Sequence, residues 1–504
     1  MKNILNITVA VIASGLLTVS CDDLLETKNY TDMASTNFFQ SEDDIDAAVV
    51  GLYVPCTTNW GYTDGGTGDW YNAIFNADIN AYYAASLVST DIACAYSTNA
   101  FDNFTIGPSS GGALTNTYNV IRFVARATDV INRIENCDGA TEEVRARYIA
   151  ETKTLRAWYM YVLLVWFGPT NVKLDPETLM SNEIEPRPDE DTYVGYIETD
   201  LTDAIKEDAF PDNYNDDADN WGRTSRGVAY GIRMRLYMHQ KEWAKAKADA
   251  EQLMNMGYAL IDSYEDVFNT SQTSEHIWSI PSNTASDNYY VAEVIPADFV
   301  RGYNHLGKEY MRGTESEYMA GWQVYCMRWD FYDTFEDNDV RKATILCEYE
   351  ASDGTTKTRS GMTGPIPIKY TDSQYYDWGI QKEFTAIRYA EVLLSYAEAD
   401  NELNGPTSGA ISAVKQVTDR AGIEIPSTAT ASQDAFREFL MEERGRELYC
   451  EGQRRTDLIR QDLYISRAVE RGNDAQDYHV LYPIPQTVIT EAGGIVEQNP
   501  GYTE

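Results

Sequence analysis

Two carboxylates fall on an otherwise apolar helix face near the C-terminus. Within residues 433–463, Phe436 and Leu440 are followed at helical spacing by Glu443 and Glu447. A carboxylate on a core-facing surface costs several kcal/mol unless it is paired. Such a site could supply a catalytic acid, or it could be part of a structural ion-pair network. The surrounding sequence favours the network.

Arginines in the same stretch supply the partners that such a network needs. They are Arg444, Arg446, Arg454, Arg455 and Arg460. Gly452 lies where the chain can fold back on itself. We therefore expect a helix, a tight turn and a second helix, fastened by ion pairs between arginines and carboxylates. The expected members of this structural ion-pair network are Glu443, Glu447, Arg454 and Arg455.

Aromatic residues in irregular segments form a second group that could do chemistry. Residues 55–80, 95–115 and 288–329 are rich in Trp, Tyr, Gly, Asn and Thr, a composition typical of loops. Aromatic rings pack on the C–H faces of sugars, and Asn, Asp and Arg bind the hydroxyls. Composition alone points to Trp70, Tyr71, Tyr289 and Tyr290 as ligand-binding residues, although each could instead pack its loop on the scaffold.

Carboxylates beside Trp329 raise the alternative of a glycoside hydrolase, which needs two carboxylates about 5–10 Å apart. They are Asp330, Asp333, Glu336, Asp337 and Asp339. So many acids are expected in a chain with 79 acidic and 40 basic residues. The four histidines are scattered, and no metalloprotease, nucleophile-elbow or phosphate-loop motif is present. We expect no catalytic residue and no cofactor.

A metal site is not expected either. Asp217 and Asp219 before Gly222 resemble a calcium loop only faintly, because Trp221 and Val228 occupy positions that need oxygen ligands. The formal net charge of −39 makes nucleic acid and anionic lipid surfaces poor partners.

The first twenty residues have the pattern of a secretory signal. Lys2 gives a positive start, residues 4–19 are mainly apolar, and small residues precede Cys21 as at a bacterial lipoprotein cleavage site. The apolar run is too short for a permanent membrane helix. We expect Cys21 to be lipidated, so that acyl chains anchor the mature protein on a membrane. Asp22-Asp23 resembles the acidic export tag of surface lipoproteins.

The remaining chain, residues 21–504, is predicted to be a single domain built mainly from α-helices. Periodicity and capping residues predict helices at 41–53, 116–134, 141–167 and 193–207, the third of them central and buried. Two helix pairs, at 225–257 and 387–421, resemble tetratricopeptide units. We expect a helical-repeat scaffold over about 38–275 and 382–504. A loop-rich insertion over about 276–381 carries a few short β-hairpins.

Side chains within the regular elements are expected to form the core. The tryptophans of this group are Trp158, Trp166, Trp243 and Trp278. The cysteines after Cys21 show no metal-ligand spacing, and buried thiols are the default interpretation. A Cys56–Cys94 bridge remains an alternative.

Several sequence blocks agree with one family. Residues 388–399 read RYAEVLLSYAEA and residues 443–460 read ERGRELYCEGQRRTDLIR. The chain closes with YPIP at 482–485 and QNPGY at 498–502. Further matches are LRAW at 155–158, the Phe167-Gly168 pair and FYDTFEDNDVR at 331–341. These blocks resemble those of the SusD/RagB lipoproteins.

The resemblance implies a surface-exposed, lipid-anchored outer-membrane protein that captures an oligosaccharide or polysaccharide and passes it to a SusC-like TonB-dependent transporter. It also implies that Tyr96, Asn99 and Trp322 lie in the ligand-binding loops. A peptide-binding member of the same family, or a helical-repeat scaffold for other proteins, is the alternative. The family match also makes the Glu443–Arg460 segment part of the scaffold and not of the binding site.

Overall fold

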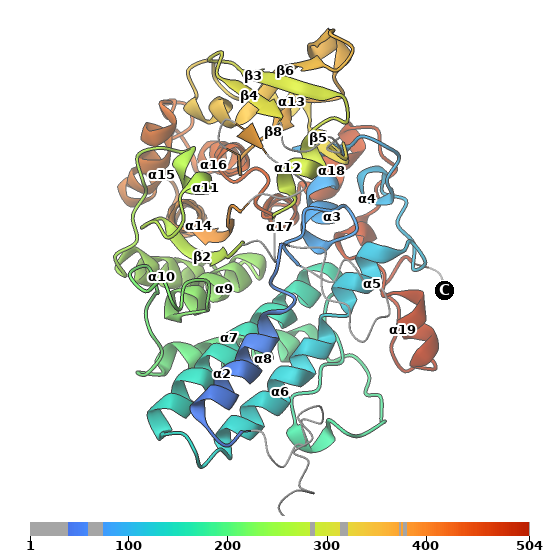
Figure 1. The fold of residues 1–504 in the computed structure, drawn as a ribbon, viewed down its shortest axis with the longest axis vertical. Helices are drawn as coiled ribbons and strands as arrows, with labels where there is room; N and C mark the ends of the chain where they lie inside the picture. The colour runs from blue at the N-terminus through green and yellow to red at the C-terminus, as the bar shows by residue number, and fades with distance from the viewer. Residues whose placement is uncertain are drawn as a thin grey trace, which may run out of the picture.

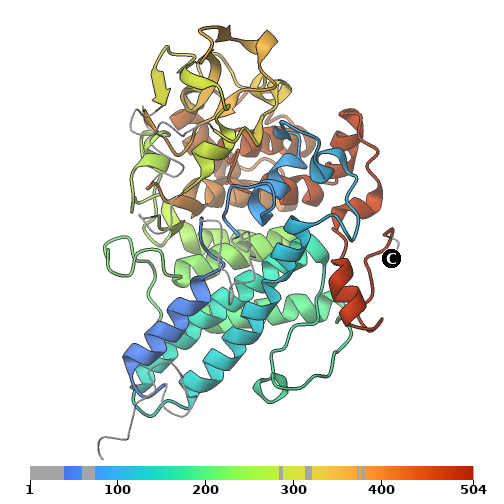
Figure 2. The ribbon, with the colours of Figure 1, turned by 45° about the vertical axis from the view of Figure 1, so that its right-hand side comes forward.

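The computed structural model describes residues 39–58, 74–282, 288–312, 321–371, 374–375 and 381–502. Helices fill its lower and middle parts in Figure 1, and most of the strands gather at the upper end. Turning the molecule by 45° keeps this division, with the strand-rich segment still above the helices (Figure 2). No helix in the described ranges is long and apolar enough to cross a membrane.

The lower half is built from four helices: α2 (Glu42–Val50), α6 (Ile121–Glu135), α7 (Glu142–Phe167) and α8 (Glu190–Lys206). Side chains cap three of them, since Ser41, Thr141 and Asp189 accept N–H groups of the first turns of α2, α7 and α8. The second half of α7 is buried on all sides, and the helix ends at Gly168. The prediction of a central buried helix at 141–167 is confirmed.

Successive helices then pack on one another through the middle of the molecule. Helix α8 contacts α9, α9 contacts α10, α10 contacts α14, and α14 contacts both α15 and α16. Their bounds are α9 Arg226–His239, α10 Trp243–Met254, α14 Tyr389–Asn404, α15 Ser408–Ala421 and α16 Gln433–Glu447. The predicted helix pairs at 225–257 and 387–421 are both confirmed. Gly231 lets α9 approach Ile387, whose side chain would lie 3.1 Å from an added Cβ.

Shorter helices complete the helical part. They are α3 Tyr82–Val88, α4 Ala100–Asn103, α5 Gly112–Tyr118, α11 Asp266–Asn269, α12 Tyr290–Val294, α13 Trp329–Tyr332, α17 Arg454–Arg460, α18 Tyr464–Glu470 and α19 Gln486–Glu491. Short 3₁₀ turns cover Gly51–Tyr53, Pro176–Thr178, Val340–Thr344, Arg359–Gly361 and Asp477–Val480. The prediction of one continuous helix at 116–134 is wrong. A turn at Asn119 and Val120 divides this stretch into the end of α5 and most of α6.

Within the described ranges the strands form three sheets. The largest has the order β7-β6-β3-β4-β9, with β8 paired to β6. Strand β2 pairs antiparallel with β10, and β1 with β5. Their bounds are β1 Ala93–Ala95, β2 His276–Ile280, β3 Phe299–Asn304, β4 Glu309–Arg312, β5 Tyr325–Met327, β6 Ile345–Ala351, β7 Thr356–Lys357, β8 Ile366–Pro367, β9 Gln374–Tyr375 and β10 Phe384–Arg388.

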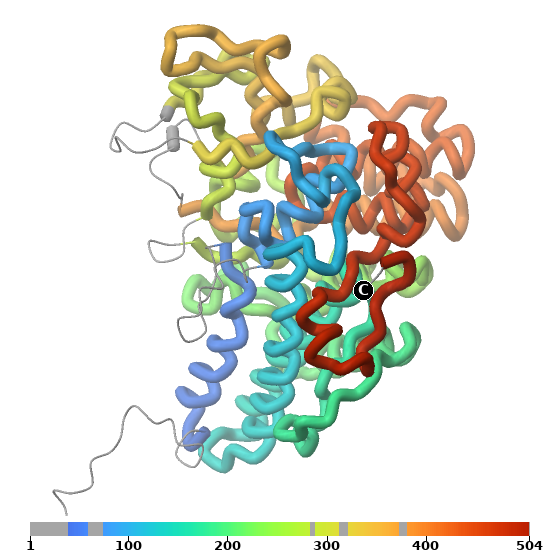
Figure 3. Tube along the Cα trace, turned by 90° about the vertical axis from the view of Figure 1, so that its right-hand side faces the viewer, coloured from blue at the N-terminus to red at the C-terminus, as the bar shows by residue number. Residues whose placement is uncertain are grey.

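The C-terminal segment closes the end of the central helix. The Asn499 amide donates to the carbonyl oxygens of Phe167 (3.0 Å) and Tyr482 (2.6 Å), and the Tyr482 N–H donates to Trp166 O (2.6 Å). These bonds satisfy carbonyls that the end of α7 leaves unpaired. In Figure 3 the last part of the chain runs beside residues 93–118, and the Gln486 N–H donates to the carbonyl oxygen of Pro108 (3.0 Å).

The C-terminal stretch forms the helix, turn and helix predicted for it. Helix α16 ends at Glu447, Gly452 adopts a φ of 83°, and α17 begins at Arg454. Both Glu443 and Glu447 are fully buried. Arg341 donates to Glu443 (2.7 Å) and to Glu447 (3.1 Å). The two glutamates therefore belong to one buried charge cluster.

Glu447 is the centre of that cluster. Its carboxylate also accepts from Arg388 (2.6 Å) and from Arg420. Other carboxylates complete the cluster, namely Glu275 and Glu451 on Arg388, Glu275 on Arg420 and Asp339 on Arg341. Burial alone would raise the pKa of Glu447, but the three guanidinium groups hold the pKa well below its usual range.

The other two expected members of the network bind elsewhere, which corrects the sequence-based prediction. Arg454 pairs with Asp91 (2.8 Å). Arg455 donates to the carbonyl oxygens of Val165 and Val480, each at 2.8 Å, and pairs with no carboxylate in the described part of the chain. Arg455 therefore fastens α17 to the end of α7, which is a backbone contact and not an ion pair.

The tryptophans assigned to the core lie in or against it. Trp158, Trp166 and Trp278 are at most 2% exposed, and Trp243 is partly buried against the same core. Among the described residues, no two cysteine sulfur atoms lie within bonding distance. Cys56 and Cys94 do not face each other, since the Cys56 Sγ lies 3.5 Å from the Tyr159 hydroxyl.

Candidate functional site

The β1–β5 ladder brings two distant segments together. Residues 93–95 pair with residues 325–327, and the Tyr96 N–H extends the ladder by donating to Val324 O (2.9 Å). Tyr96 and Trp322, which are far apart in sequence, thus lie on neighbouring backbone segments. Asp102 reinforces the junction, because its carboxylate accepts from the Ala95 N–H (3.1 Å) and from Arg328.

Helix α12 positions the segment that carries Trp322. The N–H groups of Trp322 and Val324 donate to the carbonyls of Ala292 and Glu293, each at 2.7 Å. Gly321 is required at this contact, because an added Cβ would lie 1.9 Å from Ile295 O. Backbone bonds to a buried helix therefore fix the position of Trp322, although the residue itself lies outside regular secondary structure.

Trp322 stacks on Tyr289, the residue before α12. The ring centroids are 5.8 Å apart and the ring planes differ by 25°. Both side chains are half-buried. We call Tyr289 and Trp322 the aromatic pair. Nearly parallel, partly exposed rings of this kind offer an apolar face on which a flat C–H surface can pack.

Tyr96 lies beside this site but turns its hydroxyl inward. Burial, and then the Cys326 thiol, raise the pKa of Tyr96 well above its usual value. The ring remains half-buried, so part of it is still accessible at the edge of the ladder.

Two residues expected at the site have structural roles. The Asn99 side chain accepts the N–H groups of Phe101 (2.8 Å) and Asp102 (3.3 Å), which makes it the N-cap of α4. Tyr290 is fully buried, and its ring centroid lies 5.0 Å from that of Tyr370. The expectation that Tyr290 contacts ligand is corrected, because its side chain belongs to the core. Tyr290 presents no free surface to a ligand, and the Oδ1 atom of Asn99 is occupied by the cap of α4.

Three further residues of the sequence-based prediction are outside the described ranges. They are Trp70, Tyr71 and the lipidation candidate Cys21. Their roles stay predictions. Of the seven expected ligand-binding residues, the structure brings together Tyr96, Tyr289 and Trp322.

Sequence reasoning missed Glu293, which lies on α12 behind the aromatic pair. Its side chain is 0% exposed, and neither carboxylate oxygen has a hydrogen-bond partner among the residues that the structure describes. Burial, followed by the negative charge of Asp78, raises the pKa of Glu293 well above its usual value. The only signal in the sequence is a single acid in the apolar run YVAEV, which does not reveal that the acid points inward.

We expect Glu293→Gln to stabilise the protein at neutral and alkaline pH. A carboxyl whose folded-state pKa is raised binds a proton in the folded state that the unfolded chain has released. The resulting penalty is absent below the unfolded-state pKa and grows by about 1.4 kcal/mol per pH unit above it, until the folded-state pKa is reached. The neutral amide removes this penalty.

Thermal unfolding of wild type and Glu293→Gln from pH 4 to pH 8 measures the effect. The two curves should coincide near pH 4 and separate as the pH rises, with the variant more stable. Glu438→Gln, an exposed acid on α16, is the matched control and should show no such separation. Equal stability of Glu293→Gln and wild type at pH 8 would contradict the assignment.

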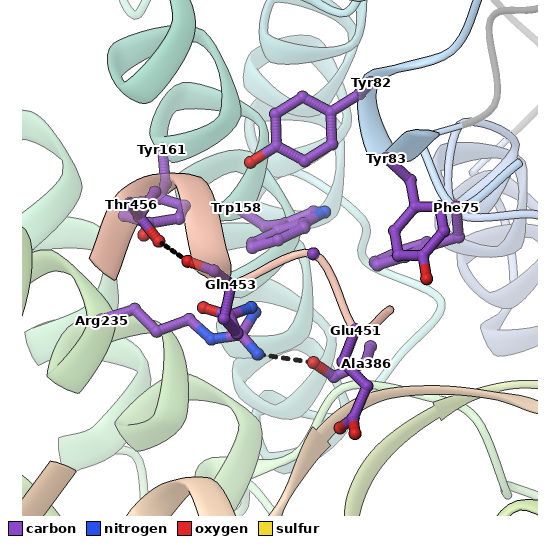
Figure 4. A pocket seen from close by; sticks show the side chains of 11 residues that line it. Phe75, Tyr82, Tyr83, Trp158, Tyr161, Arg235, Ala386, Glu451, Gln453 and Thr456 are labelled. Carbon is purple, nitrogen blue, oxygen red and sulfur yellow. Dashed lines mark hydrogen bonds between the residues drawn. The ribbon is translucent and has the colours of Figure 1, made fainter. Parts of the chain in front are cut away.

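A small cavity lies in the core and not at this site. It has a volume of about 20 Å³, and the rings of Phe75, Tyr82, Tyr83 and Trp158 form part of its wall (Figure 4). Arg235 donates to Ala386 O at its edge. The volume suffices for one water molecule and not for a sugar.

A larger groove lies between α13, α16 and α18. Its volume is about 940 Å³. The charged residues that line it are Arg328, Arg437, Arg467, Arg471, Asp91, Asp330, Asp434, Glu438, Glu442 and Glu470. Several of these charges neutralise one another, as in the pairs of Arg437 with Asp434 and of Arg467 with Asp91 and Glu442. The lining contains one aromatic ring, that of Phe331, so the aromatic pair is the better surface for a sugar.

Comparison with known proteins agrees with the resemblance seen in the sequence. The model of the SusD family matches residues 346–502, the part of the chain that contains RYAEVLLSYAEA, the Glu443–Arg460 block and the closing QNPGY. A SusD-like protein of Formosa agariphila is 26% identical over 513 residues, which cover 92% of this chain and 93% of that protein. Residues 346–502 thus match the SusD family, and the chain as a whole is similar to SusD-like proteins.

Solved structures of SusD-like proteins share the fold. One is a laminarin-binding SusD-like protein, with a TM-score of 0.72 and 22% identity, covering 92% of this chain and 100% of that one. Another is surface glycan-binding protein A from Bacteroides thetaiotaomicron in complex with laminarihexaose. It has a TM-score of 0.69 and 22% identity, and the match covers 91% of this chain and 99% of that one. The prediction of a mainly helical SusD-like fold is confirmed.

Two of the carboxylates near Trp329 are held by arginines. Asp333 forms two bonds to Arg359, at 2.7 and 2.6 Å, and Asp339 is fully buried against Arg341. Among the described residues, no group of three or more His, Cys, Asp or Glu side chains is arranged to hold a metal ion. Asp333 and Asp339 thus form ion pairs that hold this part of the chain together.

Proposed function

We propose that the protein is a surface glycan-binding protein and not an enzyme. The observation that carries the proposal is the aromatic pair, Tyr289 and Trp322, held partly exposed on backbone that α12 and Gly321 fix in place. A sugar ring can pack its C–H face on such a pair while its hydroxyls remain in water or meet polar side chains. Binding through a few stacked rings is reversible, which suits capture followed by release.

Relatives support a glycan as the ligand class. Two proteins of the same fold are described as binding laminarin and laminarihexaose. We infer that the ligand of this chain is an oligosaccharide or a polysaccharide. Laminarin is accordingly the first probe to test.

We infer further that the protein is anchored in the outer membrane, exposed at the cell surface and paired with a SusC-like TonB-dependent transporter. The signal-like residues 1–20 and Cys21 support the lipid anchor. The transporter is expected from the similarity to SusD-like proteins. In this arrangement the insertion over about 276–381 carries the aromatic pair, while the scaffold over about 38–275 and 382–504 supports it.

Electrophoresis in native gels that contain a polysaccharide tests the proposal. Laminarin, starch and xylan are cast in separate gels, with serum albumin as the reference protein. Retarded migration in at least one gel is the expected result, without any increase in reducing ends when the protein is incubated with that polysaccharide. New reducing ends would identify an enzyme. Unretarded migration in a wide glycan panel, combined with binding to peptides, would favour a peptide ligand.

A further inference from the structure

Two cysteine side chains face each other across the β1–β5 ladder. Cys94 and Cys326 are directly opposed, and their Sγ atoms lie 3.5 Å apart. Because Tyr96 donates to the opposed Val324, the alternation of the ladder gives Cys94 and Cys326 a hydrogen-bonded position. Opposed Cα atoms at such positions are about 5.5 Å apart, within the range of about 4.4–6.8 Å that disulfides span.

The β1–β5 ladder that contains these cysteines is short, although it joins two segments that are far apart in sequence. It consists of three residue pairs and joins segments whose cysteines are 232 positions apart. Tyr96 directly follows strand β1, and strand β5 begins three positions after Trp322. A covalent link at this place would keep both ligand-binding segments in register.

We propose that Cys94 and Cys326 form a cross-strand disulfide in the mature protein. The inference uses the proposed location at the cell surface, because disulfides persist in oxidising compartments. A disulfide-bonded protein oxidant of the cell envelope is the co-reactant. One cysteine thiolate attacks its disulfide to give a mixed disulfide, and the second thiolate then displaces the oxidant. The two cysteines lose two protons and two electrons, and the oxidant leaves as a dithiol.

The local environment favours Cys94 as the first nucleophile. The hydrogen bond from the Cys326 thiol lowers the pKa of Cys94; burial opposes this, and the nearby Arg328 lowers the pKa further. Cys94 is also half-buried, whereas Cys326 is fully buried. The more accessible thiol, with the greater thiolate fraction, can therefore meet an external oxidant before the buried thiol closes the bond.

The other described cysteines have different neighbours. Cys56 contacts the Tyr159 hydroxyl, and the Cys137 thiol donates to Phe39 O (3.1 Å). Burial raises the pKa of Cys56 to about 12 and that of Cys450 to about 11. The thiols of Cys56 and Cys450 are therefore poor nucleophiles near neutral pH.

Mass spectrometry of the full chain, isolated from the envelope of an exporting host, tests the proposal. The protein is denatured with N-ethylmaleimide present, so that free thiols are blocked before digestion. No Lys or Arg lies between Lys28 and Arg122, so trypsin leaves Cys56 and Cys94 on one peptide and a second digestion with chymotrypsin is needed. We expect a linked peptide pair that contains Cys94 and Cys326, with the other described cysteines alkylated.

Variants separate this link from other pairings. In Cys326→Ser, Cys94 should become fully alkylated, whereas Cys347→Ser should retain the link. Full alkylation of both Cys94 and Cys326 in the wild type, before and after incubation with oxidised glutathione, would overturn the proposal. The readout needs no glycan, so a failure of the disulfide is distinguishable from a failure of the proposed function.

Discussion

Glu447→Gln is expected to lower the free energy of unfolding by about 3–5 kcal/mol at pH 7. The carboxylate of Glu447 contacts Arg341, Arg388 and Arg420, and its side chain is 0% exposed. The amide has nearly the same shape but carries no charge. The variant therefore keeps the packing but removes the one carboxylate that all three guanidinium groups contact, in a place that water does not reach.

Urea unfolding of wild type and variant measures this loss. Glu438→Gln is the matched control, because it makes the same change on the exposed side of the same helix. Its effect should stay within about 0.5 kcal/mol. A Glu447→Gln protein as stable as the control would show that the cluster contributes little. Glycan affinity of the folded variant should be unchanged, since the cluster lies in the scaffold.

The loss should also depend on pH in a defined direction. Arginines depress the folded-state pKa of Glu447, so its contribution is present above the unfolded-state pKa of about 4.3 and is lost as the pH falls through the folded-state pKa. The gap in stability between wild type and Glu447→Gln should therefore be full at pH 6–7 and narrow as the solution is acidified. A gap that widens in acid would contradict this assignment.

Trp322→Ala is expected to weaken glycan binding by about 2 kcal/mol or more, which corresponds to roughly thirtyfold in Kd. The substitution removes one ring of the aromatic pair and the apolar face that it shares with Tyr289. Calorimetry with the glycan that retards the wild type in gels gives the affinity. The melting temperature should change little, because the ring is only half-buried.

Two companion variants make the binding result specific. Trp329→Ala removes another half-buried tryptophan, one that packs against Arg359 (4.7 Å from the ring centroid), and should leave affinity unchanged. Tyr289→Ala should weaken binding, and the double variant with Trp322→Ala should lose less than the sum of the single losses, because stacked neighbours act together. Unchanged affinity in Trp322→Ala would remove this residue from the site.

Local patterns predicted the helices well, because caps and periodicity depend on neighbouring residues. Thr141 and Gly168 bound α7 as expected. The partners of Glu443 and Glu447 could not be predicted in the same way. Arginines abound in the C-terminal stretch, yet Arg341, which contacts both glutamates, lies about a hundred residues earlier in the chain. Only the tertiary packing determines which of the many arginines of the chain pairs with each glutamate.

The roles of single residues in the proposed binding site were equally hard to predict from the sequence. Tyr289 and Tyr290 are adjacent and identical in type, but the start of α12 turns one ring toward Trp322 and the other into the core. Amino-acid composition could identify the segment as a candidate binding loop, but it could not show in which direction each tyrosine ring points. The opposition of Cys94 and Cys326 likewise depends on the register of a ladder between distant segments, which no local pattern encodes.

The closure of α7 by Asn499 and Tyr482 has a consequence for how the protein is made. The carbonyl of Phe167 accepts from Asn499, a residue that is synthesised more than three hundred positions later. Arg187, only twenty residues after Phe167, also donates to this carbonyl (2.6 Å), and the end of the chain adds the second donor. The last residues to be synthesised therefore complete contacts that hold the first half of the chain in place.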